Sequence, residues 1–289
     1  MSFRTVVITN KAKLNYKNRY LVVKKELEEK YIHLSEIDTL IIDSIAISIS
    51  SYLLKELLDN KINVIFCDEK HNPYSELKPL NARHNSSKKI LEQIKWKAKK
   101  KDTLWQNIVI NKIRNQMCLL RKTKSEGVDL LCEYIDDVKI GDKTNREGHA
   151  AKVYFNALFG KKFTRNKVCD VNAALNYGYN VLLSTFNKEV VCNGYLTQLG
   201  IHHKNEFNEF NLSCDLMEPF RVIIDNFVYH NFDRKFDQQY KLDLVNIFNN
   251  TYLYKKKKYT LKDIIRLYTQ DILQSLTTDS KYGEFIYEE

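Results

Sequence analysis

The sequence predicts an α+β protein, with a small β-rich N-terminal domain over residues 1–78 and a larger all-α domain over residues 79–289. The first observation behind this prediction is the length of 289 residues, which at about 150 residues per domain suggests two domains. The second is a change of pattern from short β-branched runs to apolar residues at helical spacing. The third is the scarcity of chain breakers, 8 glycines and 3 prolines, which favours long helices.

Strands and one helix are expected in the first domain. Four runs are rich in Val, Ile, Leu and Thr and have the length of a strand. They cover residues 5–9, 20–23, 39–43 and 61–67. The isoleucines of 45–49 alternate with smaller residues, which is the period of two of a strand. The leucines of 53–58 then change to helical spacing, with Ser50 or Ser51 as the expected N-cap.

Helices dominate the second domain, after a linker that we place at 71–79 because it holds two of the three prolines. An apolar stripe at spacings of four, four, four and three indicates a long helix. The stripe consists of Trp105, Val109, Ile113, Met117 and Leu120. Further helices are expected around 147–159, 170–184, 219–231 and 261–277. Thr260 and Asp263 are expected to cap the helix over 261–277. The lysines of 255–258 lie between tyrosines, which indicates a basic loop or hairpin.

The positive charge is concentrated in one stretch of the chain. The net charge is +10, and residues 79–125 hold 13 Lys or Arg against 2 Asp or Glu, whereas the rest of the chain is nearly neutral. Lys112, Arg114 and Arg121 can lie off the apolar stripe, so one helix could face the core on one side and a polyanion on the other, and these three residues are the candidate nucleic-acid contacts. On charge alone, a phosphate-backbone footprint and a solubilising basic helix fit equally well.

Several classes of protein are excluded. No apolar run reaches the roughly 18 residues that span a bilayer, and the N-terminus lacks the apolar stretch and cleavage site of a secretory signal. The six cysteines are widely spaced without a Cys-x-x-Cys pair, so a zinc ribbon is not expected. We expect a cytoplasmic protein with reduced thiols and no membrane partner.

Glu147 is the first candidate for chemistry. In the helix expected over 147–159, Glu147 precedes the apolar positions 150 and 151 by three and four residues, so it shares their face. A carboxylate that faces a core needs an arginine, a cage of hydrogen bonds or a metal ion. The alternative is a first-turn glutamate that interacts with the helix dipole. Both interpretations fit this segment.

Two further segments offer metal ligands. His202 and His203 are adjacent, and because neighbouring side chains diverge on helices and strands, at most one should reach a given site. Asp215 and Glu218 can stand one above the other on a helical turn, at or just before a helix N-terminus, since a proline follows. Arg221 can neutralise either acid, which is the structural alternative.

Together these segments offer Glu147, a histidine at 202 or 203, and Asp215 with Glu218. Oxygen ligands with one imidazole suit Mg²⁺ or Mn²⁺ better than structural zinc, which favours thiolates. A metal site beside a basic helix is suited to phosphodiester chemistry, in which the metal polarises the phosphorus centre and activates a water or a 3′-hydroxyl.

Four motifs follow one another in order over about 145–225. They are Glu147-Gly148-x-Ala150-Ala151-x-x-Tyr154-Phe155, Asp170-Val171-Asn172-Ala173-x-Leu175-Asn176-Tyr177-Gly178-Tyr179, Leu199-Gly200-x-x-His203 and Asn211-Leu212-x-x-Asp215-Leu216-Met217-Glu218-Pro219-Phe220-Arg221. With these motifs the sequence resembles the CRISPR-associated adaptation integrase family, the most widespread of the Cas proteins, and looks closest to its type II members. Val171 stands where the family often has proline, which is a local departure.

The resemblance implies a metal-dependent endonuclease and integrase of spacer acquisition. Glu147, His203 and Glu218 fall on the family's catalytic metal ligands, and Asp215 falls on a further acidic position. A DNA fragment's 3′-hydroxyl would attack a phosphodiester at the leader–repeat junction, and a second attack would join the other strand. The implied partners are double-stranded DNA, a second copy bound through the β domain, and the second Cas protein. Type II relatives also engage the effector nuclease and an accessory DNA-binding ring protein.

Two other functions fit part of this pattern. A stand-alone metal-dependent nuclease would use the same ligands with water as the nucleophile. A non-catalytic architectural DNA-binding protein would need only the basic stretch. The second alternative gives no reason for a cluster of acids with an imidazole.

Overall fold

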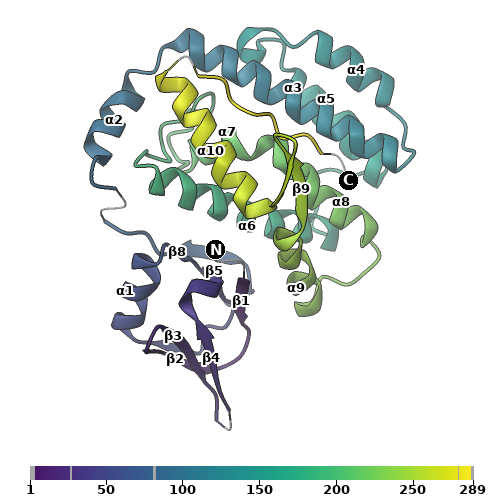
Figure 1. Cartoon of the computed structure of the whole chain (residues 1–289). Coiled ribbons are helices and arrows are strands. Elements are labelled where there is room, and N and C mark those ends of the chain that lie inside the picture. Colours follow the sequence, from purple (N-terminus) through teal and green to yellow (C-terminus); the bar gives the residue numbers. More distant parts are fainter. Residues whose placement is uncertain (1–3, 27, 81–82, 279, 288–289) are drawn as a thin grey trace. The chain divides into compact units, whose positions relative to one another are not determined.

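The computed structural model describes residues 4–26, 28–80, 83–278 and 280–287. The chain divides into two compact units, Met1–Ala82 and Arg83–Glu289 (Figure 1). The division falls shortly after the boundary expected at 78/79. The first unit is rich in strands and the second in helices, so the predicted fold class is confirmed.

Two four-stranded sheets make up the first unit. One sheet has the order β1 (Arg4–Ile8), β5 (Ile37–Ile42), β7 (Asn63–Cys67) and β8 (Pro73–Glu76). The other has the order β4 (Glu29–His33), β3 (Tyr20–Lys24), β2 (Ala12–Lys17) and β6 (Ile47–Ile49). Strand β5 pairs in parallel with β1 and β7, and all of its side chains are buried. This matches the continuous apolar run that a central parallel strand requires.

The first unit has one α-helix within its described residues, α1 (Ser51–Asp59), and this helix contacts a strand of each sheet. Ser50 is its N-cap, because the Ser50 hydroxyl accepts a hydrogen bond from the backbone N–H of Leu53 at 3.3 Å. Leu53 and Leu57 are fully buried and share one hydrophobic core with Leu14 of β2. The expected helix and its serine cap are confirmed.

Three strands of the first unit escaped the sequence patterns. In β2 the buried Ala12 and Leu14 alternate with lysine and asparagine, a weak period of two. Strand β4 is largely exposed, so it carries little apolar signal. The linker expected at 71–79 is wrong in part, because β8 begins at Pro73 inside it. Proline is tolerated there because β8 lies at the edge of its sheet, where a missing N–H breaks no ladder.

The second unit is built mainly of helices. Its α-helices are α2 (Ser86–Ile94), α3 (Ala98–Lys122), α4 (Val128–Asp136), α5 (Arg146–Phe159), α6 (Asp170–Cys192), α7 (Asn211–Met217), α8 (Arg221–His230), α9 (Gln238–Asn246) and α10 (Leu261–Thr277). Among the residues that the structure describes, this unit also has the short 3-10 helices η2 (Ile140–Asp142), η3 (Glu218–Phe220) and η4 (Ile247–Asn249). No helix in the described part of the chain is both long and apolar enough to cross a membrane.

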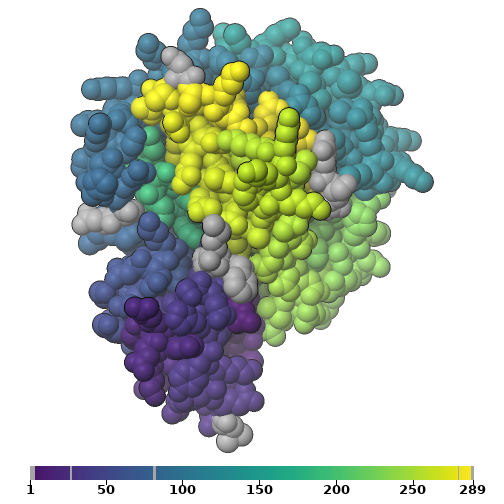
Figure 2. Space-filling view, viewed as in Figure 1, coloured from purple at the N-terminus to yellow at the C-terminus, as the bar shows by residue number. Residues whose placement is uncertain are grey.

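An antiparallel hairpin, β9 (Thr251–Tyr254) with β10 (Lys257–Thr260), interrupts the helices of the second unit. The second domain is therefore not all helical, and the basic segment that we expected as a loop or hairpin is a hairpin. The hairpin stands on the visible surface of the unit beside α10, yellow-green against yellow (Figure 2). Thr260 caps α10 by accepting from the N–H of Asp263 at 3.3 Å, as the sequence predicts.

Helix α3 is the central support of the second unit. All five residues of its apolar stripe are buried, which confirms the predicted inner face. The helix contacts α4, α5, η3 and α8, and Figure 1 shows α3, α4 and α5 side by side. The helix expected over 219–231 is divided, since η3 precedes α8. The elements that carry the expected ligands thus pack directly on α3.

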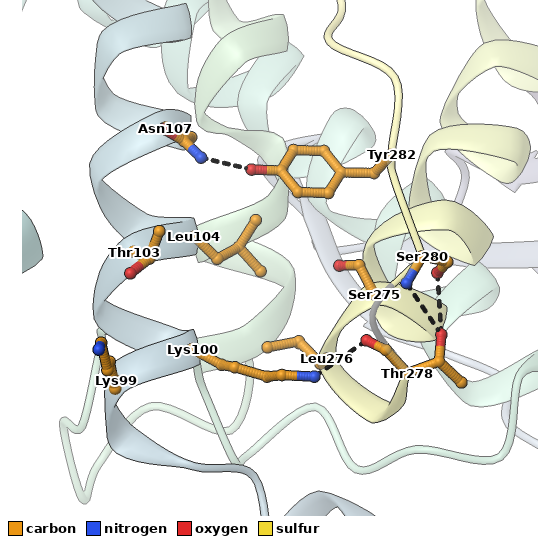
Figure 3. A pocket seen from close by; sticks show the side chains of 10 residues that line it. All are labelled: Lys99, Lys100, Thr103, Leu104, Asn107, Ser275, Leu276, Thr278, Ser280 and Tyr282. Atoms are coloured by element: carbon orange, nitrogen blue, oxygen red, sulfur yellow. Dashed lines mark hydrogen bonds between the residues drawn. The ribbon is translucent and has the colours of Figure 1, made fainter.

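The last described segment, residues 280–287, is extended, and we call it the C-terminal strap. Asn107 donates to the Tyr282 hydroxyl at 2.7 Å (Figure 3), and Arg114 pairs with Glu284 at 2.8 Å. Phe285 is buried and stacks on Phe220 of η3 with ring centroids 4.3 Å apart. The strap therefore runs along α3 and touches the segment that contains Glu218.

Candidate active site

Three helical segments bring two carboxylates to one ammonium group. The Nζ atom of Lys112 on α3 donates to Oε1 of Glu147 on α5 and, at 2.5 Å, to Oε2 of Glu218 in η3. Lys112 is 6% exposed and Glu218 is 5% exposed, whereas Glu147 is more open to solvent. The structure therefore unites two of the three predicted ligands around a positive charge.

The start of α5 fixes the position of Glu147. The Asp142 carboxylate accepts from the backbone N–H groups of Arg146 and Glu147, at 2.8 and 3.0 Å, so it caps the helix. A side chain at Gly148 would meet the Asn145 side chain at 2.9 Å. Both sequence interpretations of Glu147 therefore hold. It stands in the first turn of α5, and its carboxylate also faces a buried partner, Lys112.

Glu218 lies between two cations. Its Oε1 accepts from Nε of Arg221 at 3.0 Å, while its Oε2 accepts from Lys112. Burial raises the pKa of this carboxyl, but the charges of Arg221 and Lys112 outweigh burial and bring the pKa to about 2. Burial likewise lowers the pKa of Lys112, and the two carboxylates more than reverse that effect. Glu218 is therefore ionised throughout the physiological range.

Asn115, one turn after Lys112 on α3, anchors the backbone beside Glu218. Its side-chain amide donates to the carbonyl oxygens of Pro219 and Phe285, both at 2.9 Å, and its carbonyl accepts from Tyr287 N–H at 3.0 Å. The Asn115 side chain is fully buried. One amide therefore joins η3 to the C-terminal strap.

A second part of the site holds His203. Its Nδ1 lies 2.5 Å from Oδ1 of Asp215, a carboxylate that also accepts from the backbone N–H groups of Ile201, His202 and His203. Because an ionised carboxylate only accepts, Nδ1 carries the proton and Nε2 of the neutral ring is left as a ligand atom. The hydrogen bond to Asp215 raises the pKa of His203 above its ordinary value, and the charges of Glu218 and Glu147 add to the rise.

Gly200 makes this turn possible. A Cβ atom there would lie 2.4 Å from the carbonyl oxygen of His203 and 2.9 Å from Oδ2 of Asp215. Asp215 stands inside α7 and Glu218 at the start of η3, so the acids share a turn region but have different partners. The further acid expected at the site, Asp215, is thus an orienting carboxylate for His203, and both of its oxygens already accept hydrogen bonds.

His202 has a different environment from its neighbour. Its ring stacks on Trp105 of α3 at 4.3 Å with an interplanar angle of 4°, and burial lowers its pKa. His203 meets the same Trp105 edge-on at 5.6 Å. The side chains of the adjacent histidines therefore diverge, as predicted: the ring of His203 bonds to Asp215, whereas His202 reaches Asp215 only through its backbone N–H.

A buried acid lies behind Glu218. Asp225 of α8 is 1% exposed and accepts hydrogen bonds from the hydroxyls of Tyr154 and Tyr179. Burial raises the Asp225 pKa to about 6, although the two hydroxyls oppose the rise. Arg221 lies over the ring of Tyr179 at 4.6 Å, so its guanidinium connects this cluster to Glu218.

The donor set of the site fits the chemistry of the divalent metal that the sequence predicts. Two carboxylates and one imidazole with a free Nε2 are suitable ligands for Mg²⁺ or Mn²⁺, and the Lys112 ammonium marks a point where the structure holds a cation. As they stand, however, no three His, Cys, Asp or Glu side chains within the described ranges are gathered closely enough to hold a metal ion. The residues fit a divalent cation in chemistry, and Lys112 occupies the space between them.

The three residues expected to bind DNA do not share one exposed face. Lys112 is the clearest correction, because it is buried by its two carboxylates and presents no free ammonium to a phosphate. Arg114 is partly exposed and pairs with Glu284, and Arg121 is exposed. Other lysines of the basic stretch face solvent; they are Lys88, Lys95, Lys97 and Lys99.

Sequence reasoning missed Asp142, Asn115 and Asp225. A signal existed for Asn115, because polar residues recur along the long helix at the spacing of a buried face. They are Asn111, Lys112, Asn115 and Gln116, and all four are buried. Asp142 and Asp225 left no comparable signal, since a single acid near a helix start or inside an apolar run has many ordinary explanations.

A cavity of about 350 Å³ lies elsewhere on the second unit, between the start of α3 and the end of α10 (Figure 3). Lys99, Lys100 and Thr103 line one side, and the hydroxyls of Ser275 and Tyr282 line the other. None of the predicted ligands lines it.

A site of this composition, with two carboxylates, an oriented imidazole and two cations, is suited to phosphodiester chemistry. The family model of the CRISPR associated protein Cas1 matches residues 5–258. A curated relative, the CRISPR-associated endonuclease Cas1 of Neisseria meningitidis serogroup C, is 36% identical over 238 residues, which is 81% of this chain and 77% of the relative. The chain belongs to the Cas1 family, and it is a CRISPR-associated endonuclease.

Solved structures show the same fold. A CAS1 protein from Thermotoga maritima superimposes with a TM-score of 0.81 at 16% identity, over 99% of this chain and all of that one. A casposase bound to integration product gives 0.75 at 17% identity, over 97% of this chain and 92% of that one. A chain of a Cas6-RT-Cas1–Cas2 complex gives 0.75 at 19% identity; this chain is covered to 98%, but spans only 36% of that one.

Proposed function

We propose that this protein is a metal-dependent DNA integrase of CRISPR adaptation, which joins the 3′-hydroxyl ends of a short DNA fragment into the repeat array. The observation that supports the proposal most is the convergence of Glu147 and Glu218 on one cation position, within electrostatic reach of an imidazole held by Asp215. Membership of the Cas1 family supports the CRISPR setting.

Glu147, Glu218 and Nε2 of His203 would hold Mg²⁺ or Mn²⁺. When bound, the metal supplies Lewis acidity at the phosphorus centre and lowers the pKa of an attacking hydroxyl. The chain's own residues prepare this site: Arg221 keeps Glu218 ionised, Asp142 fixes Glu147, and Asp215 sets the ring orientation of His203. Such outer partners contribute about 10- to 100-fold to affinity or activity in metal sites.

We propose that the protein joins DNA strands rather than only hydrolysing them. The ligands serve both reactions, since a water and a 3′-hydroxyl are alternative nucleophiles for the same phosphodiester. The casposase neighbour, which shares this fold, is described as bound to an integration product. That likeness supports joining as the reaction of this chain as well.

DNA binding and partners form the second part of the proposal. Exposed lysines of the basic stretch offer a path for the phosphate backbone. A Cas1–Cas2 assembly is named for one structural neighbour, which supports the second Cas protein as a partner here. We further propose that two copies associate through the β-rich unit, and that the effector nuclease and ring protein of type II systems join the assembly in the cytoplasm.

Incubation with supercoiled plasmid and a short duplex with free 3′-hydroxyls tests the reaction. With Mn²⁺ we expect the labelled duplex to become joined to the plasmid, and with the metal chelated we expect no joining. A matched duplex with 3′-deoxy ends should give no joined product. Nicks and fragments without joined product would replace integration by plain nuclease activity, and joining unaffected by chelation would overturn the metal dependence.

A further inference from the structure

The candidate active site contains a cation of its own. Lys112 is buried, and its Nζ is shared by one oxygen of Glu147 and one oxygen of Glu218. We propose that the Lys112 ammonium occupies the cation position of the metal-free protein and competes with the divalent cation for both carboxylates. This inference rests on the metal dependence proposed above.

Two cations cannot use these oxygens together. Both carboxylates turn toward the same Nζ, so a metal ion that takes them must displace the ammonium. The charges also repel each other, and a buried site screens this repulsion far less than water does. Occupation by Lys112 therefore lowers the affinity for metal.

Lys112 also has a constructive role before the metal arrives. Two carboxylates at one point repel each other unless a positive charge stands between them. The ammonium holds Glu147 and Glu218 at one point, so the oxygens stay near the arrangement that the divalent cation needs. The exchange then replaces one cation by another without rebuilding the backbone.

The other cation of the site is less free to move. Arg221 binds the opposite oxygen of Glu218, and its guanidinium lies over the Tyr179 ring at 4.6 Å. An ammonium on a flexible four-carbon chain has no such platform and can rotate its donors to new partners. The metal ion therefore displaces the Lys112 ammonium, whereas Arg221 remains hydrogen-bonded to Glu218.

Titration with Mn²⁺, with free metal followed by electron paramagnetic resonance, tests this competition without any assay of activity. Lys112→Met and Lys112→Gln remove the charge and keep most of the volume. We expect each to bind Mn²⁺ at least tenfold more tightly than the wild type. The matched control is Lys241→Met, another buried lysine, which lies over the rings of Tyr177 and Phe236; its Mn²⁺ affinity should stay unchanged.

The outcomes separate this inference from the proposed function. Wild-type or weaker affinity in both Lys112 variants, with a measurable site in the wild type, would overturn the competition. Equal binding by the wild type and Glu147→Gln would instead overturn the metal site itself. A Lys112 variant that folds only when Mn²⁺ is added supports the inference, since the metal then replaces the missing cation.

A measurement on the wild type covers the case in which both variants fail to fold. Reductive methylation followed by peptide mapping reports how accessible the Lys112 amine is. We expect little methylation in metal-free buffer and markedly more with saturating Mg²⁺, since the metal releases the ammonium. The same extent of methylation in both buffers would contradict the exchange.

Discussion

At the residue scale, the two adjacent histidines show how identical side chains acquire different environments. His203 is bound to Asp215, whereas His202 is stacked flat on Trp105. The sequence could predict that they diverge, because neighbours point apart. It could not predict the stacking partner, since Trp105 lies almost a hundred positions away in the chain.

His203→Ala should lower strand joining by more than about 100-fold, because it removes a proposed metal ligand. His202→Ala should lower joining by less than about tenfold, since it removes only a stacking contact, which is worth about 1 kcal/mol. Joining rates at equal protein concentration, with thermal melting to confirm folding, provide the comparison. An inactive His202 variant beside an active His203 variant would reverse the assignment.

Asp225 gives a prediction about pH. Its pKa in the folded protein is raised to about 6, so its contribution to stability is complete below about pH 4 and is lost as the pH rises through 6. Asp225→Asn removes this loss. The stability of the variant relative to the wild type should therefore improve by up to about 3 kcal/mol between pH 4 and pH 7.

Urea denaturation of both proteins at several pH values measures this difference. Other groups titrate alike in the two proteins, and the tyrosine and arginine partners of Asp225 stay in place. A stability difference that does not vary between pH 4 and pH 7 would show that folding does not raise the pKa of Asp225.

At the scale of elements, α3 positions residues of the site, and the C-terminal strap packs along this helix. The apolar stripe of α3 was predictable from periodicity alone, because five large residues repeat at helical spacing. The strap was not predictable, since residues 280–287 have neither helical nor strand periodicity, and Phe285 is buried only through its tertiary contact with Phe220. An extended segment of this kind leaves no local signal.

Asn115→Leu should release the strap and loosen η3. The change removes three buried hydrogen bonds, to the carbonyl groups of Pro219 and Phe285 and from the N–H group of Tyr287, and the loss of a buried hydrogen bond costs about 1 to 3 kcal/mol. We expect a loss of at least about 3 kcal/mol in the free energy of unfolding, together with reduced joining at temperatures where the protein is folded. Asn107→Leu is the matched control, because it breaks only the link to Tyr282 (Figure 3).

Comparing Asn115→Leu with Asn107→Leu distinguishes two roles: anchoring of the backbone beside Glu218, and attachment of the strap to α3 in general. Equal losses of joining activity in both would mean that Asn115 has no special relation to Glu218. A defect in Asn115→Leu that is much larger than that in Asn107→Leu supports the connection through Pro219.

At the scale of the whole molecule, charge is distributed unevenly along the chain, and the folded structure decides which charges reach solvent. Net charge identified the basic stretch, but it could not show that Lys112 turns inward, because burial depends on carboxylates 35 and 106 positions away. We therefore predict that DNA binds to the lysines of the basic stretch that face solvent, such as Lys95, Lys97 and Lys99.

Reversing Lys95, Lys97 and Lys99 to glutamate should weaken binding to many DNA sequences alike. Each lost phosphate contact lowers the salt slope of the logarithm of affinity by about 0.9 on duplex DNA. The matched control reverses three exposed lysines of the hairpin segment, Lys256, Lys257 and Lys258. Salt titrations of both variants decide the path, and a slope reduced only in the hairpin variant would place the DNA there.

We propose that Glu147, Glu218 and His203 hold one divalent cation, in a position that the Lys112 ammonium fills when the metal is absent. A crystal structure with Mn²⁺, with data collected at its absorption edge, tests this most directly. We predict one anomalous peak, which marks a Mn²⁺ ion within bonding distance of the carboxylates of Glu147 and Glu218 and of Nε2 of His203. The Lys112 ammonium should be displaced from between the two carboxylates. A peak at another place in the chain, or an ammonium that still bridges the carboxylates under saturating Mn²⁺, would contradict the account.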